Sequence, residues 1–290
     1  MLVTIDRILR KISPALHAFL KSNFRKVRKK INPKLSKDEF RDLLETKLKL
    51  RKGDVVFVHS SMRNLYLKFS KQEILSVLLE IVGEEGTVMF PCWQFNVRAE
   101  DYLRDHDIVF DINQSPSAVG RIPEDLRHDP LAVRSFHPTN SIVAKGKYAA
   151  LLMAGHEDGI YPCGSQSPWG KMLAFDAKVI GIGVSVNSLT FVHAVEDEMK
   201  DDFPIKARKD EVYTCKCIDR QGEIRLIRTL VASTAIGHRD VYGFFRKYIS
   251  RDVYRDVPVK GMHFFSFDAV PVFDALKDLA RKNQTIYKFT

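Results

Sequence analysis

A histidine and a glutamate three residues apart, His193 and Glu196, are the side chains in this sequence best placed for acid–base chemistry. If residues 187–197 form a helix, the two side chains lie on one face of it. The carboxylate then holds one imidazole nitrogen as a proton donor and leaves the other free to accept a proton from a substrate. The spacing therefore predicts a general base, and an ordinary ion pair on a surface helix is the alternative.

Strands that end beside this helix are expected to position it. Residues 179–187 read as a buried strand that ends in a loop, and residues 55–58 and 87–90 read as two further strands. Open α/β sheets place their sites where strands end. Ser60 and Ser61 directly follow the strand over 55–58, and their free N–H and O–H groups suit a phosphate or an amide-rich chain.

The alternation of strands and helices predicts an α/β fold with a mixed central sheet flanked by helices. A capping-box pattern at Ser36–Glu39 opens the first helix of this body. A hairpin is predicted near the C-terminal end, with strands over 212–218 and 224–229. No linker divides the body, so we expect a single domain over residues 36–290 and a basic helical arm over residues 1–35.

Charge and cysteine content exclude several classes of protein. The chain has 290 residues and a net charge of +10, but eleven basic residues against one acidic residue lie in the first 37 positions. The remainder is close to neutral, which argues against nucleic-acid binding. Four scattered cysteines favour a reducing, cytoplasmic setting. Cys215 and Cys217 lack a second pair of ligands, so no metal site is expected.

The basic arm has apolar residues every three or four positions, which predicts one or two amphipathic helices. Charged residues interrupt every run that is long enough to cross a membrane. Two roles remain open for the arm: a peripheral contact with the inner face of a membrane, or packing against the chain's own body or a second copy in a homodimer.

A polar segment over residues 96–114 has little periodicity. A loop of this length within a compact domain is usually functional. We therefore expect an irregular loop or lid over these residues.

Six segments resemble one known family when they are taken together and in order. They are HSS at 59–61, GTVMFP at 86–91, SPSAVGRIPEDLR at 115–127, RSFHPTNS at 134–141, SPWGK at 167–171 and VIGIGVSVNSLTFVHAVE at 179–196. The family is the aminoglycoside 3-N-acetyltransferases, also called the antibiotic N-acetyltransferases. The resemblance covers about residues 36–275.

The resemblance implies direct acetyl transfer from acetyl-coenzyme A to a primary amine of an amino sugar or aminoglycoside-like acceptor. Thr190, His193 and Glu196 match the family's T-x-x-H-x-x-E element, with His193 as the base and Glu196 as its orienting carboxylate. His137 and Ser141 match its His-Pro element, which implies that His137 lines the acceptor or thioester site.

The resemblance also implies two sets of binding residues. The coenzyme would be held by Ser60, Ser61, Arg121, Arg127, Arg134, Ser135 and Ser141. The acceptor would be held by Asp197, Thr190, Cys92 and Trp93. Asn140 departs from the family pattern, because many members carry a second histidine there. This departure and the basic arm bear on the identity of the acceptor more than on the chemistry.

Two other functions stay open on the sequence. Cys92 or Cys163 is a candidate nucleophile for a cysteine-dependent acyltransferase or hydrolase. The chain is alternatively a non-catalytic scaffold that docks through its basic arm.

Overall fold

The structure is a computed structural model that describes residues 31–105, 109–233 and 238–288, together with residues 13, 16, 19, 20 and 23. The predicted arm over residues 1–35 thus lies largely outside the described residues, and its two roles stay predictions. Among the helices that the structure describes, each is too short or too polar to cross a membrane.

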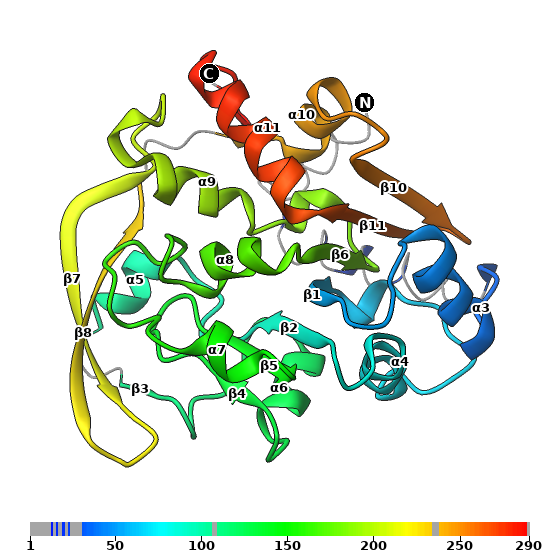
Figure 1. Ribbon diagram of the computed structural model, residues 1–290, viewed down its shortest axis with the longest axis horizontal. Coiled ribbons are helices and arrows are strands. Elements are labelled where there is room, and N and C mark those ends of the chain that lie inside the picture. The colour runs from blue at the N-terminus through cyan, green and yellow to red at the C-terminus, as the bar shows by residue number, and fades with distance from the viewer. Residues whose placement is uncertain are drawn as a thin grey trace.

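A seven-stranded mixed sheet forms the centre of the protein and confirms the predicted α/β class (Figure 1). Its strands, in spatial order, are β10 (Tyr254–Val259), β11 (Met262–Asp268), β6 (Lys178–Ile182), β1 (Val55–Ser60), β2 (Thr87–Pro91), β5 (Ile142–Gly146) and β4 (Val133–Arg134). β6, β1 and β2 are parallel, whereas β11 and β5 join them antiparallel on either side. The carboxyl ends of the three parallel strands therefore meet at one edge of the sheet.

The central strands β1 and β2 are mostly apolar because both faces of the sheet are covered there. In β1, Val55 and Phe57 belong to one hydrophobic core, and Val56 and Val58 belong to another on the opposite face. This alternation follows from the two-residue repeat of a strand. Burial of each large apolar side chain contributes about 1.5–3 kcal/mol, so the two cores fix the sheet firmly.

The two faces of the sheet carry different helices. One core includes residues of α3 (Lys37–Asp42), α4 (Glu73–Val82) and α6 (Arg121–Arg127). The other includes residues of α7 (Ala149–Met153), α8 (Pro168–Lys171), α9 (Val192–Met199), α10 (Val241–Tyr248) and α11 (Ala269–Arg281). The predicted capping box is present before α3: Glu39 N–H donates to Ser36 Oγ at 3.1 Å, and Ser36 N–H donates to Glu39 Oε2 at 2.8 Å.

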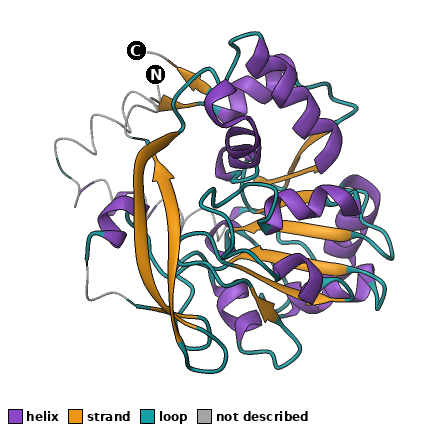
Figure 2. Cartoon of the chain, turned by 60° about the vertical axis from the view of Figure 1, so that its left-hand side comes forward, coloured by secondary structure: helices purple, strands orange, loops and turns teal. Residues whose placement is uncertain are grey.

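The predicted hairpin is longer than expected and stands beside the central body as a curved ribbon (Figure 2). Its strands are β7 (Arg208–Ile218) and β8 (Ile224–Ala232). The expectation of an irregular loop over residues 96–114 is wrong, because part of that segment packs onto this ribbon. It contains helix α5 (Ala99–Leu103) and strand β3 (Phe110–Asp111), which pairs with β7. Tyr102 and Phe110 are buried, so their packing orders this segment although most of its residues are polar.

A short two-stranded sheet lies near the C-terminal end. It pairs β9 (His238–Arg239) with β12 (Tyr287–Lys288) in antiparallel register, with Tyr287 opposite Arg239. Sequence patterns do not predict these two-residue strands. They place both Tyr287 and Arg239 over α9.

Candidate active site

Helix α9 begins where β6 and β1 end, and Thr190 fixes its first turn. The Thr190 hydroxyl lies 3.0 Å from His59 Nε2, and the Thr190 N–H donates to the same nitrogen at 3.1 Å. The Trp169 indole N–H donates to Thr190 Oγ1 at 3.3 Å. Burial lowers the pKa of His59 to about 3, with a smaller contribution from Arg239, so His59 is neutral and accepts these bonds.

His193 and Glu196 lie on one face of α9, as the spacing predicts. His193 Nδ1 lies 2.8 Å from Glu196 Oε2. The Glu196 side chain is buried at 2% exposure, whereas the His193 side chain is 21% exposed. Burial opposes ionisation of Glu196, but its interactions with His193, Arg208 and Tyr287 outweigh burial and lower the pKa of the carboxyl. Glu196 is therefore a buried carboxylate anion that is hydrogen-bonded to the His193 imidazole.

Two residues from the β9–β12 sheet complete this pair. The Tyr287 hydroxyl donates a hydrogen bond to Glu196 Oε1. An Arg239 guanidinium N–H lies 3.2 Å from His193 Nε2, and another donates to the Asn187 carbonyl at 3.0 Å. An arginine side chain can only donate hydrogen bonds, so His193 Nε2 is the acceptor. The imidazole proton is then on Nδ1, which donates a hydrogen bond to Glu196. This is the tautomer that a general base requires.

A pocket of about 360 Å³ opens at the carboxyl ends of the parallel strands, and we call it the strand-end pocket. Its lining includes Ser60, Ser61, Trp93 and Thr190, together with Val119, Pro123 and Ser188. The structure thus brings two residues predicted to bind the coenzyme, Ser60 and Ser61, together with two predicted to bind the acceptor, Trp93 and Thr190. Thr190 in this wall directly precedes the turn that carries His193.

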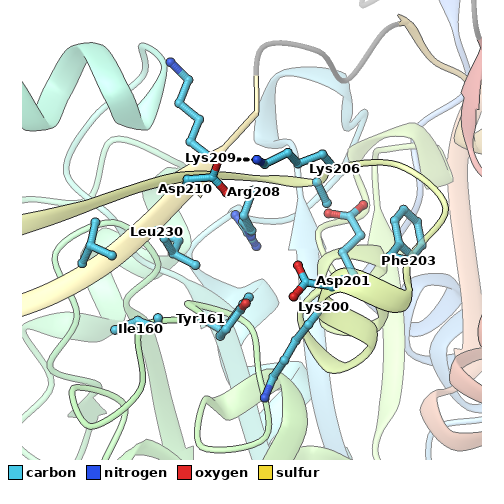
Figure 3. Close-up of a pocket in the computed structure, with 13 residues that line it drawn as sticks. Ile160, Tyr161, Lys200, Asp201, Phe203, Lys206, Arg208, Lys209, Asp210 and Leu230 are labelled. Atoms are coloured by element: carbon cyan, nitrogen blue, oxygen red, sulfur yellow. Dashed lines mark hydrogen bonds and ion pairs between the residues drawn. The ribbon is translucent and has the colours of Figure 1, made fainter.

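A second pocket of about 480 Å³ lies between α9 and the β7–β8 ribbon, and we call it the ribbon pocket (Figure 3). Its lining includes Glu196, Lys200, Asp201, Arg208, Tyr161 and Leu230. His193 and Glu196 lie on one face of α9, and Thr190 precedes the helix by two residues. Thr190 lines the strand-end pocket and Glu196 lines the ribbon pocket, whereas His193 itself lines neither.

His137 occupies a different environment from the one expected. It is fully buried, its ring stacks on His156 with centroids 4.4 Å apart, and no pocket described above includes it. The N–H groups of Thr139 and Asn140 donate to its Nδ1 at 3.3 and 3.1 Å. Burial lowers the pKa of His137 well below its ordinary value. The prediction that His137 lines the acceptor or thioester site therefore finds no support in its position.

Arg134 is also buried, and its donors serve the protein's own backbone. Its guanidinium donates to the carbonyls of Ser115, at 2.5 Å, and Cys92, and its Nε donates to Ser141 Oγ at 3.3 Å. Ser141 Oγ in turn donates to the Cys92 carbonyl at 2.5 Å. Arg134 and Ser141 thus join three chain segments, which leaves neither for the coenzyme contacts expected of them.

Ser135 has a comparable role. Its Oγ accepts the Ile142 N–H at 2.9 Å and lies 2.8 Å from His156 Nδ1. His156, which the sequence did not single out, is buried, and its Nε2 lies 2.9 Å from the Pro162 carbonyl. Ser135 is therefore part of an internal hydrogen-bonded network instead of a coenzyme surface.

Of the three predicted arginines, only Arg121 has an exposed guanidinium. Its side chain is 67% exposed and pairs with Asp125 at 2.7 Å one turn along α6. Arg127 is 8% exposed, and both oxygens of Glu124 accept its donors at 2.7 Å. Arg121 lies between Val119 and Pro123 in sequence, two residues of the strand-end pocket, so it is the arginine that remains able to meet a phosphate.

Asp197 and Cys92 are both enclosed within the fold. The carboxylate of Asp197 accepts two bonds from Arg208, at 2.6 and 2.8 Å, and the Cys163 N–H at 2.7 Å. The thiols of Cys92 and Cys163 are fully buried, and burial raises the pKa of each. Asp197 is therefore a structural ion pair, not the acceptor contact that was expected, and neither thiol is placed as a nucleophile.

The described residues contain no cluster of three or more histidine, cysteine, aspartate or glutamate side chains that suits a metal ion. The residues that sequence reasoning missed are His59, Arg239 and Tyr287. His59 stands beside the two serines that were selected, so a buried histidine at a strand end was a usable signal. Arg239 and Tyr287 lie 46 and 91 residues from their partners on α9, and no sequence pattern links them.

Comparison with known proteins matches this architecture to one family. A sequence model described as aminoglycoside 3-N-acetyltransferase matches residues 57–281. Aminoglycoside N(3)-acetyltransferase IX of Micromonospora chalcea is 34% identical over 166 residues, which cover 51% of this chain and 57% of that protein. The matched segments span 54–58% of the first three curated relatives, little more than half of their length.

Two solved structures share the fold over most of the chain. One is described as AAC-IIIb in a binary complex with CoASH; it has a TM-score of 0.72 at 23% identity and covers 89% of this chain and 100% of its own. The other is AAC-VIa bound to sisomicin, with a TM-score of 0.68 at 24% identity over 87% of this chain and 99% of its own. At these identities the likeness establishes the fold.

Proposed function

Because the chain belongs to the aminoglycoside 3-N-acetyltransferase family, we propose that it transfers an acetyl group from acetyl-coenzyme A to a primary amine of an amino sugar or aminoglycoside-like acceptor. The observation that carries this proposal is the His193–Glu196 pair with Tyr287 behind it, flanked by Thr190 in the wall of one pocket and Glu196 in the wall of another. A direct transfer needs two substrates to meet at a single base, and this arrangement provides for that.

The strand-end pocket takes acetyl-coenzyme A. Ser60, Ser61 and Trp93 offer hydroxyl groups and an aromatic wall to the pantetheine chain, which is rich in amides. Arg121 at the start of α6 supplies an exposed guanidinium for a phosphate. The relative described as a complex with CoASH supports a coenzyme in this fold.

The ribbon pocket takes the acceptor. Its amine reaches His193 Nε2 and displaces the Arg239 guanidinium that lies there. His193 accepts a proton from the amine as nitrogen attacks the thioester carbonyl; the new C–N bond forms, the C–S bond breaks, and the coenzyme leaves as a thiolate that is then protonated. Glu196 stabilises the imidazolium that results. No covalent enzyme intermediate is required.

Tyr287 is a positioning residue in this mechanism. Glu196 has two oxygens, and Tyr287 binds the one that His193 leaves free. The carboxylate is thereby held in one orientation, which in turn holds the imidazole. Tyr287 lies beyond residue 281, where the family match ends, so the family pattern did not lead to it.

The cysteine-dependent alternative finds no support, because both candidate thiols are buried and their pKa values are raised. The scaffold alternative depends on the arm, most of which lies outside the described residues. The hydrogen-bonded arrangement of His193, Glu196 and Tyr287 favours an enzyme over a scaffold.

A thiol-release assay tests the proposal. Purified protein is incubated with acetyl-coenzyme A and each of a panel of amino sugars and aminoglycosides, and free coenzyme thiol is measured. We expect release with at least one acceptor, and a product heavier by one acetyl group. His263 is exposed on β11, so His263→Gln is a matched control for His193→Gln. Absence of release with every acceptor, in protein shown to be folded, would refute the proposal.

A further inference from the structure

The walls of the ribbon pocket carry both signs of charge in nearly equal number. Four basic side chains line it, namely Lys200, Lys206, Arg208 and Lys209, against the three acidic side chains Glu196, Asp201 and Asp210. Figure 3 shows Arg208, Asp201 and Tyr161 facing the same space. An acceptor with several ammonium groups would need a wall made mostly of carboxylates, because each added positive charge requires an opposite partner once it leaves water.

Internal pairing commits three of these seven charges. Arg208 is bound by both oxygens of Asp197, and Lys209 pairs with Glu100 at 2.6 Å. Glu196 is occupied by His193 and Tyr287. These groups are therefore neutralised in place and hold the shape of the pocket.

Lys200 and Asp201 line the same pocket and are exposed, and no ion pair among the described residues involves either of them. Lys200 Nζ instead lies 5.4 Å from the centre of the Tyr161 ring, which keeps the ammonium at the pocket wall. Lys206 pairs only with Asp210, and these side chains are 59% and 86% exposed, so solvent screens the pair. The pocket thus offers one uncommitted carboxylate, one uncommitted ammonium and a second ammonium in a weak pair.

From this balance we infer that the acceptor is an amino sugar that carries one free amine and one anionic group, and that Lys200 is the residue that selects it. This inference rests on the proposed function, and it replaces a polycationic antibiotic with a zwitterionic acceptor. Asp201 attracts the ammonium toward α9, and Lys200, with Lys206, binds the anionic group. The anion is a carboxylate or a phosphate, since an ammonium binds either as a point charge.

The test compares acceptors of different charge in the thiol-release assay on the full-length chain. The probes are 2-amino-2-deoxyglucose, its 6-phosphate, the corresponding amino uronic acid, and sisomicin as the polycation. We expect kcat/KM for the phosphate or the uronic acid to exceed that for sisomicin by at least tenfold. Whichever anionic probe is preferred identifies the source of the negative charge.

A charge reversal then tests the role of Lys200. Lys200→Glu should lower kcat/KM for the preferred anionic sugar by tenfold or more. It should change kcat/KM for 2-amino-2-deoxyglucose, which has no anionic group, by less than threefold, and it should raise kcat/KM for sisomicin. Lys47, an exposed lysine near α3, provides the matched control Lys47→Glu, which should leave all four values unchanged. Preference for sisomicin, or an equal effect of Lys200→Glu on every acceptor, would overturn the inference.

Equilibrium binding distinguishes a failure of this inference from a failure of the proposed function. Calorimetry with the same probes in the presence of coenzyme A needs no turnover. Binding of an anionic amino sugar that Lys200→Glu weakens supports the inference even if no thiol is released. Tighter binding of sisomicin, or no binding of any anionic probe, contradicts it.

Discussion

Helix α9 and residues 134–141 each carry a histidine that was matched to an element of the same family, yet the structure places the two histidines in opposite environments. His193 is partly exposed. Its Nδ1 is hydrogen-bonded to the buried Glu196 carboxylate, and its Nε2 contacts the Arg239 guanidinium. His137 is sealed inside the fold, where two backbone N–H groups occupy its Nδ1. A motif match therefore identifies a residue that the fold needs, and only its surroundings separate a chemical role from a structural one.

The largest effect is expected where the carboxylate behind His193 is removed. Glu196→Gln keeps the size of the side chain but removes the charge that stabilises the imidazolium. We expect turnover at saturating substrates to fall about a hundredfold to ten-thousandfold, the range for loss of a proton-transfer group. Melting temperature should change little, and thiol release measures the loss. Near-normal turnover would remove Glu196 from the mechanism.

The second prediction tests the structural role of the segment that carries His137. Arg134→Met leaves the Ser115 carbonyl without its side-chain donor inside the fold, and the Cys92 carbonyl keeps only the Ser141 hydroxyl. We expect the free energy of unfolding to fall by about 1–3 kcal/mol, the cost of one buried unsatisfied group. Arg121→Met, on an exposed side chain, should cost less than about 1 kcal/mol. Urea unfolding of both variants measures the difference. Equal stabilities would show that the hydrogen bonds of Arg134 do not stabilise the fold.

The third effect concerns pH. Burial lowers the pKa of His59 and His156 to about 3 and that of His137 well below its ordinary value. In the unfolded chain each has a pKa of about 6.5. Below pH 6.5 the unfolded state therefore binds protons that the folded state excludes, and stability falls as pH drops from 6.5 toward 3. Each histidine contributes up to about 1.4 kcal/mol per pH unit.

Urea unfolding at pH 7.5, 6.5 and 5.5 tests this slope. The wild-type protein should lose more stability over the lower interval than over the upper one, and His156→Gln should lose less over the lower interval because one titrating group is gone. A stability that is constant from pH 7.5 to 5.5 would mean that these histidines are accessible to protons in the folded state.

The smallest effect is expected at Tyr287. Tyr287→Phe removes one hydrogen bond to Glu196 and keeps the ring. Turnover should fall about threefold to tenfold, which corresponds to the roughly 1 kcal/mol of a typical hydrogen bond. KM should stay unchanged, because Tyr287 positions the base without touching a substrate. A change in KM alone would instead place Tyr287 in a binding role.

Sequence reasoning predicted the fold class and the His193–Glu196 pair because both depend on local patterns. Apolar runs identify strands that are buried on both faces, and a three-residue spacing identifies one face of a helix. Burial of Arg134, His137 and Asp197 depends on segments that meet only in the folded chain, such as Cys92 with Ser115 or Asp197 with Arg208. The sequence carries the chemistry of these side chains but not their distance from solvent.

The contribution of Tyr287 and Arg239 was beyond prediction for a similar reason. Two-residue strands have no periodicity to detect, and their side chains reach α9 only because β9 and β12 pair. Ser60 and Ser61 were predicted as binding residues because they follow a strand, whereas Trp93 was predicted from the family resemblance. Their meeting in the strand-end pocket agrees with the expectation that parallel strands end at one edge of the sheet, and their role in binding stays a prediction.

The most direct test of the central claim compares His193→Gln with His137→Gln in one assay, with turnover expressed per folded molecule. The two substitutions make the same chemical change in two matched family segments. We predict that His193→Gln loses turnover at least a hundredfold and keeps its melting temperature, whereas His137→Gln keeps turnover within a few-fold and unfolds at a lower temperature. The reverse outcome, with His137→Gln folded but inactive and His193→Gln active, would contradict the account.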